Sequence, residues 1–336
     1  MVYTNISFED MCFTKIYGWL VPITFNLNRT TAYAFPVLSL IGLIIIVLGT
    51  YKKSSTSCGH FYMMYLGMAD LYAILGAEVP YLMDIAYVKF SRPMCIVKLF
   101  HANCPKQIAV WILVLMTVDR AVAVSKPLQA ATLCTVARAK KAVAIVSTIL
   151  AIINIIGAAF HEAIDLTGQW TTCMIVNLTG SAIYSNLNNT LALFLPFLVV
   201  AVANGVIIVG VRRSANMDAT QQVTDDRKQA TAKRITVLVI STSLAFLVLS
   251  FLAALTIVLE YEHGSETYLY YFTHCENLTY GSFMIIGNSI GTVLYQANHM
   301  VNAYIFLCSR SFRNDVKGGV KSISIISRFK LWQSAS

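Results

Sequence analysis

The stretch VLMTVDRAVAVSKPL, from Val114 to Leu128, closes an apolar run with an acid–base pair. Asp119 and Arg120 form this pair, and Pro127 follows seven residues after the arginine. Cys95 stands at the opposite end of the same run, 25 residues before Arg120. The stretch therefore predicts one long apolar helix with a charged pair at one end and a cysteine at the other.

The composition of the whole chain favours a membrane protein. Of its 336 residues 57% are hydrophobic and only 12% are charged, whereas soluble domains carry about 25% charged residues. Runs that reach the roughly 20 apolar residues needed to span a bilayer lie near 32–51, 59–85, 95–125, 142–162, 187–211, 235–259 and 280–307. In lipid, backbone polar groups must bond within the segment, so each run is predicted to be a helix. We expect an all-α bundle of seven transmembrane helices.

The distribution of charge predicts the orientation of these helices. With the N-terminus outside, 19 of the 25 Lys and Arg residues fall on the cytoplasmic side, as the positive-inside rule requires. The first residues, MVYTNISFED, lack the pattern of a secretory signal peptide, so the first span is expected to direct insertion. The net charge of +9 is then explained by attraction to the inner leaflet of the lipid bilayer, and no nucleic-acid partner is predicted. On the outer side acids outnumber bases, and this negative surface would attract a cationic ligand.

Cysteines and glycosylation sequons gather on the predicted outer side. Asn-X-Ser/Thr sequons begin at Asn5, Asn28, Asn177, Asn188 and Asn277. We predict glycosylation at Asn5, Asn28 and Asn177. The cysteines expected to face the oxidising exterior are Cys12, Cys95, Cys173 and Cys275. Four cysteines allow three pairings, and their positions in the sequence do not decide among them.

Several polar landmarks inside the spans resemble one known family. The second span contains LGMADL, ending in Asp70-Leu71, the third ends in Asp119-Arg120, and the fifth contains Pro196. The seventh span contains Asn298 and Asn302, followed by CSRSFR. Together these resemble rhodopsin-like G-protein-coupled receptors, and the fifth and seventh spans resemble the invertebrate FMRFamide and myosuppressin receptors. The resemblance covers nearly the whole chain and is strongest in the second, third and fifth spans.

Other landmarks of that family are missing. Leu43 stands where the family has asparagine, and the fourth span lacks its tryptophan. Ser250 occupies the place of the sixth-helix tryptophan, while Ala303 and Phe306 replace the seventh-helix proline and tyrosine. Because proline is the usual cause of a helix kink, we predict a divergent member with an altered activation hinge.

The resemblance implies an organisation for the chain. It divides the chain into an extracellular N-terminus (1–31), a receptor domain (32–308) and a cytoplasmic tail (309–336) that begins with a short amphipathic eighth helix. It pairs Cys95 with Cys173, which leaves Cys12 for Cys275. It implies a plasma-membrane protein in which Arg120 is held by its neighbouring acid when inactive and engages a heterotrimeric G protein when active. The residues expected at the G-protein surface are Asp119, Arg120, Pro127, Arg212, Arg213, Lys233 and Arg234.

Asp70 and Lys106 are ionisable residues predicted to lie within the membrane. Asp70 matches the family's sodium-coordinating aspartate, but Pro105 and Ala109 stand where members offer Asn and Ser. An ammonium group at this depth costs about 2.5–3.5 kcal/mol, so we expect Lys106 to pair with Asp70 or Glu78 and to act as an internal cation. The alternative is a lysine that reaches into a wet pocket. The predicted intramembrane switch comprises Asp70, Lys106, Asn298 and Asn302.

Two residues that differ from those of known receptor classes exclude some classes of ligand. Ala102 stands where amine receptors have aspartate, and Gln296 stands where opsins carry the retinal lysine. No amine ligand, retinal or other cofactor is therefore expected. The residues proposed to line the outer pocket are His101, Asn103, Lys106, Gln107, Glu162, Trp170 and Gln296.

The combined prediction is a receptor that binds an extracellular ligand, a neuropeptide, and activates a heterotrimeric G protein. The alternative within the same fold is a chemosensory receptor for small molecules. A transporter or channel would predict an internal repeat, and none is visible. No catalytic set or metal-ligand spacing appears, so neither an enzyme nor a metal site is predicted.

Overall fold

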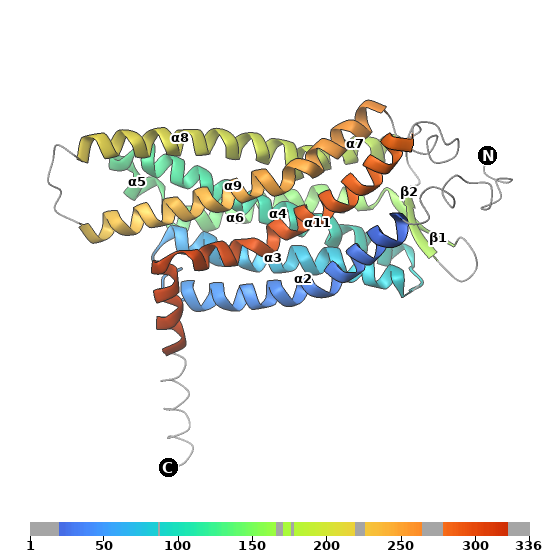
Figure 1. Ribbon diagram of the computed structural model, residues 1–336, viewed down its shortest axis with the longest axis horizontal. Helices are drawn as coiled ribbons and strands as arrows, with labels where there is room; N and C mark the ends of the chain where they lie inside the picture. Colours follow the sequence, from blue (N-terminus) through green and yellow to red (C-terminus); the bar gives the residue numbers. More distant parts are fainter. Residues whose placement is uncertain are drawn as a thin grey trace, which may run out of the picture.

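The computed structural model describes residues 20–86, 88–165, 171–175, 178–218, 226–263 and 278–321. Its elements are α2 (Leu20–Thr50), α3 (Cys58–Ile85), α4 (Arg92–Ser125), α5 (Pro127–Leu133), α6 (Val136–Ala158), β1 (His161–Asp165), β2 (Thr171–Ile175), α7 (Leu178–Asn189), η1 (Thr190–Phe194), α8 (Leu195–Asp218), α9 (Asp226–His263) and α11 (Leu278–Cys308). A further helix begins at residue 310 and is described to residue 321. The long helices run along one axis as a bundle, with β1 and β2 at one end (Figure 1).

The helices correspond to the seven predicted spans. By length and composition, the described segments that can cross a membrane are Pro22–Thr50, Arg92–Ser125, Val136–Ala158, Ala182–Arg213 and Arg234–Val258. Helices α3 and α11, of 28 and 31 residues, are as long as these and pack into the same bundle. The predicted all-α membrane fold is therefore confirmed.

Several predicted boundaries differ from the structure at the outer end, and α2 and α6 are two examples. Helix α2 begins at Leu20 rather than near residue 32, so the helix includes Asn28. Helix α6 ends at Ala158, whereas the fourth span was predicted to continue to residue 162. Residues 161–165 instead pair antiparallel with β2, with Ala163 opposite Cys173. Because strand pairing and a disulfide at Cys173 hold this segment, its backbone has partners outside any helix.

Helix α6 shows how the bundle meets lipid. Ile145, Ile149, Ile152 and Ile156 follow one helical face and are each more than half exposed. A contiguous apolar surface of this kind would favour association in water. Against lipid tails it is well solvated, so the face marks the bilayer side of the bundle.

Pro196 explains an irregular turn between α7 and α8. Residues Thr190–Phe194 form a π-helix, in which the Leu195 N–H bonds to the Thr190 carbonyl. Proline has no N–H, so the Leu191 carbonyl lacks a partner in its own helix. The Trp111 indole N–H donates to this carbonyl at 2.8 Å. The irregular turn thereby joins α4 to the outer half of the fifth span.

The helix beginning at residue 310 turns away from the bundle axis (Figure 1). Phe312 is 2% exposed and packs on Phe306 with ring centroids 5.7 Å apart. Gly49 leaves space for this contact, because a Cβ there would lie 2.6 Å from the Phe312 ring. On its polar side, Asp315 accepts a hydrogen bond from Lys53 at 2.7 Å. This helix has the amphipathic character that was predicted for it.

Candidate functional site

Asp119 and Arg120 form an ion pair with each other at the end of α4. An Arg120 guanidinium N–H donates to Asp119 Oδ2 at 2.5 Å, and both side chains are 10% exposed. The thiol of Cys58 donates to Asp119 Oδ1 at 3.5 Å. Arg120 Nε is buried, and no described residue bonds to it. The arginine thus has one carboxylate partner and spare donor capacity.

Cys134 lies between α5 and α6, against the same pair. Its thiol donates to the Asp119 carbonyl at 3.5 Å. Burial raises the pKa of Cys134 to about 11, and the negative charge of Asp119 adds to this increase. The thiol therefore stays protonated at neutral pH and remains a hydrogen-bond donor.

The other residues predicted for the cytoplasmic surface lie on α5, α8 and α9. Pro127 begins α5, and Arg212 and Arg213 are exposed near the end of α8. Arg234 is exposed and donates to Ser311 Oγ at 3.4 Å, whereas the side chain of Lys233 lies outside the described part. A cleft of about 590 Å³ opens between α9 and α11, lined by Arg234, Val237, Leu238, Ser241, Ile305, Cys308 and Ser309.

Asp70 is buried against two polar residues of α11. One of them, Asn302, belongs to the predicted switch, and the other, His299, does not. His299 Nδ1 lies 3.0 Å from Asp70 Oδ1, and Asn302 Nδ2 donates to Oδ2 at 2.8 Å. Asn302 of the predicted switch therefore contacts Asp70, whereas Lys106 does not. Of the two acids expected to pair with Lys106, Glu78 is the one that influences it electrostatically. Asn298 does not bond to Asp70, and its buried Oδ1 has no partner among the described residues.

His299 was missed because a histidine in an apolar run has no distinctive sequence signal. Its side chain is 1% exposed, and 229 residues separate it from its carboxylate partner. Its spacing of three residues from Asn302 was the available clue, since residues at i and i+3 lie on one face of a helix.

A pocket of about 120 Å³ lies between the outer halves of α4, α7, α9 and α11. Its lining residues are Asn103, Lys106, Asn188, Asn189, Ala192, Leu193, Ala253, Ile257 and Tyr295. Of the predicted ligand residues, Asn103 and Lys106 lie in this lining. Asn188 was read in the sequence only as the start of a glycosylation sequon, and the structure places it in the wall of the bundle.

The remaining predicted ligand residues lie elsewhere. His101 Nδ1 is 2.5 Å from the Tyr72 hydroxyl, and Gln107 is fully buried behind the pocket. Gln296 is 9% exposed and is absent from the lining. Glu162 lies on β1, 3.3 Å from the Arg92 guanidinium. Trp170 lies outside the described residues.

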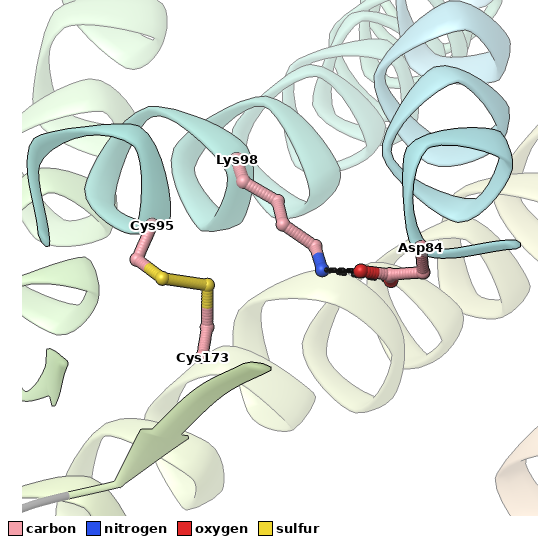
Figure 2. The surroundings of a disulfide bond; sticks show 4 residues. All are labelled: Asp84, Cys95, Lys98 and Cys173. Carbon is pink, nitrogen blue, oxygen red and sulfur yellow. Dashed lines mark hydrogen bonds and ion pairs between the residues drawn. A yellow bond between two sulfur atoms is a disulfide. The ribbon is translucent and has the colours of Figure 1, made fainter. Parts of the chain in front are cut away.

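A disulfide and an ion pair tie the outer end of α4 to its neighbours. Cys95 and Cys173 are joined with a Cα–Cα distance of 5.6 Å, which confirms this pairing. Nearby, Lys98 Nζ lies 2.5 and 2.7 Å from the two Asp84 oxygens, as Figure 2 shows. The proposed Cys12–Cys275 bridge and the sequons at Asn5 and Asn177 lie outside the described residues.

A comparison with protein families decides what this architecture is. A family model described as 7 transmembrane receptor (rhodopsin family) matches residues 42–302, which is more than half of the chain. The chain belongs to this receptor family. It is therefore a multi-pass membrane receptor and not an enzyme. A search of curated proteins gives no match.

The sodium ion that the family resemblance implies beside Asp70 does not fit the residues present. His299 and Asn302 already lie within hydrogen-bond distance of the two carboxylate oxygens. Pro105 and Ala109 offer no side-chain oxygen where oxygen ligands would be needed. The receptor therefore satisfies this carboxylate with its own side chains.

The receptor's sixth and seventh spans lack the usual kink residues. Helices α9 and α11 each run unbroken, over 38 and 31 residues, without an internal proline. Ser250 is fully buried, and its Oγ has no partner among the described residues. Helix α9 instead contacts α8 through two pairs of residues. Phe246 packs against Phe197, and Ser243 donates to Asn204 at 2.9 Å.

Proposed function

We propose that this receptor binds an extracellular peptide and activates a heterotrimeric G protein at the plasma membrane. The observation that carries this proposal is the buried Asp119–Arg120 pair at the cytoplasmic end of α4. Among the described residues Arg120 has one hydrogen-bond partner, Asp119, so a small rearrangement of Asp119 releases its guanidinium. The exposed Arg212, Arg213 and Arg234 provide a basic rim around it, to which a negatively charged surface of the transducer would be attracted.

The β-hairpin at the outer end supports a peptide as the ligand. Strands β1 and β2 form a two-stranded sheet among the described residues, so each strand has one edge without a described partner. An extended peptide can add its backbone to such an edge and place alternate side chains into pockets. The Cys95–Cys173 disulfide holds this hairpin to the outer end of α4.

Nucleotide exchange on purified G proteins tests the transducer assignment. The full-length receptor is screened in cells against amidated and free-acid peptides, and then reconstituted with each G-protein subtype. We expect Arg120→Gln to abolish exchange, because the substitution removes the guanidinium group that is proposed to contact the G protein. Arg138→Gln is the matched control, since Arg138 is exposed at the start of α6 and bonds only through its backbone.

Two outcomes would contradict the proposal. Equal exchange by Arg120→Gln and the unmodified receptor would show that Arg120 is not the transducer contact. A response to small molecules without any response to peptides would favour a chemosensory receptor.

A further inference from the structure

Lys106 places its amino group in the lining of the outer pocket, and no described acid forms an ion pair with it. It lines the pocket, and it forms no ion pair or hydrogen bond within the described part of the chain. Glu78 is the acid that influences it electrostatically. Glu78 is 2% exposed and does not line the pocket. No aspartate or glutamate is among the described lining residues, and Lys106 is the ionisable basic residue among them.

A chain of hydrogen bonds behind the pocket sets the orientation of Asn188. The Tyr184 hydroxyl donates to Asn154 Oδ1, and Asn154 Nδ2 donates to Gln107 Oε1 at 2.8 Å. Gln107 Nε2 in turn donates to Asn188 Oδ1 at 2.7 Å. The acceptor oxygen of Asn188 is therefore occupied. Its NH₂ group remains as a donor in the pocket that Lys106 also lines, because an amide carries both functions.

We propose that this pocket binds a carboxylate at one end of the ligand, with Lys106 as its counter-ion and Asn188 as a hydrogen-bond donor. This inference rests on the proposed function of the site as a ligand pocket. An ammonium group and an amide NH₂ are both donors, and charge-assisted hydrogen bonds to a carboxylate are about twice as strong as neutral ones. A carboxamide would gain no ion pair from Lys106.

The size of the pocket indicates that it holds an end group. Pockets that enclose a drug-sized ligand measure about 300–1,000 Å³, whereas this one measures about 120 Å³. A carboxylate with a short hydrocarbon or a single terminal residue fits such a space. A peptide with a free C-terminus would place its carboxylate here while the rest of it extends towards the hairpin.

Thermal unfolding of the full-length purified receptor tests the charge preference without a known ligand. The probes are matched pairs, hexanoate with hexanamide and N-acetylphenylalanine with its carboxamide. A compound that binds the folded state raises the unfolding midpoint by mass action. We expect each effective acid to act at a concentration at least about tenfold below that of its amide, because a difference of about 1.4 kcal/mol is tenfold. A response to hexanoate alone indicates a free fatty acid or small acid, whereas a response to N-acetylphenylalanine alone indicates a peptide end.

Lysine variants of the same helix locate the effect. Lys106→Met should abolish the difference between acid and amide, while Lys106→Arg keeps it. Lys98→Met is the matched control, because Lys98 lies on α4 but pairs with Asp84 outside the pocket. Equal action of acid and amide on the unmodified receptor would overturn the proposal, even if a variant failed to fold. A preference for acid that persists in Lys106→Met would overturn it as well.

Failure of the proposed function is distinguishable from failure of this inference. A receptor stabilised by acids that drives no nucleotide exchange would retain the carboxylate site and lose the G-protein assignment. A receptor that drives exchange but is stabilised equally by acids and amides would give the opposite result.

Discussion

Two buried carboxylates, Asp119 and Asp70, are satisfied in different ways. Asp119 pairs with the next residue in the chain, Arg120, and also receives thiol hydrogen bonds at the cytoplasmic edge. Asp70 lies in the middle of the bundle and depends on residues of α11 more than 200 positions away. The first arrangement forms within one helix, whereas the second requires two helices to pack in register. Local pairing leaves Arg120 easy to release, and long-range pairing fixes α3 against α11.

The largest effect is expected from breaking the long-range arrangement. Replacement of His299 by leucine leaves Asp70 Oδ1 buried without a partner. Leaving a buried hydrogen-bonding group without its partner costs about 1–3 kcal/mol, and more when the group is charged. We expect the unfolding midpoint of the His299→Leu receptor to fall strongly in a thermal-shift assay at neutral pH.

A second substitution separates the lost contact from lost packing. Asp70→Asn combined with His299→Leu removes the buried carboxylate as well, so the double variant should recover much of the stability. Exchange of sodium for choline should not change the midpoint of the unmodified receptor, because its own side chains lie against both Asp70 oxygens. A double variant as unstable as His299→Leu, or a clear sodium effect, would contradict this account.

A smaller effect on stability is expected at the cytoplasmic pair. Hydrogen bonds to charged groups contribute about 1.5–3 kcal/mol, and exposure of this helix end to salt reduces the value for Asp119. We expect Asp119→Asn to lower the unfolding free energy by about 1–2 kcal/mol. The same change releases Arg120, so ligand-free nucleotide exchange should rise about fivefold, as one kcal/mol permits.

The comparison fails if Asp119→Asn leaves ligand-free exchange unchanged. Asp315→Asn is a suitable control, because Asp315 pairs with Lys53 and His60 at the cytoplasmic end and forms no ion pair with Arg120. This control should lose little stability and show no increase in exchange.

The smallest effect concerns the thiol that rests on the cytoplasmic pair. Because the pKa of Cys134 is raised to about 11, little thiolate is present at neutral pH. Its reaction with a maleimide should accelerate about tenfold per pH unit below that value, since the thiolate is the nucleophile. Asp119→Asn removes a negative charge that raises this pKa, so the reaction at pH 8 should become faster.

The labelling is measured in a Cys308→Ser background, because Cys308 is exposed and would react first. A Cys134 that reacts at pH 7 as fast as an exposed thiol, in folded receptor, would show that Asp119 does not shield it.

Much of the candidate site could be predicted where the signal was local. The Asp119–Arg120 pair is adjacent in the chain, and its spacing to Cys95 marks one helix. The Cys95–Cys173 bridge followed from the family resemblance. The relay through Tyr184, Asn154, Gln107 and Asn188 joins α4, α6 and α7 and leaves no periodic pattern in the sequence. Asn188 begins a glycosylation sequon although it lines a pocket within the bundle. A three-residue motif carries no information about burial.

Composition and charge by themselves predicted a membrane protein with seven spanning helices and a basic cytoplasmic face. Those properties depend on run length, hydrophobicity and charge, which accumulate along the chain and are independent of packing. Tertiary structure alone decided which group meets which inside the bundle. It placed His299 and Asn302 against Asp70, and it placed Lys106 in the pocket lining. Helix rotation and register set those contacts, and a shift of one residue turns a helical side chain by about 100°.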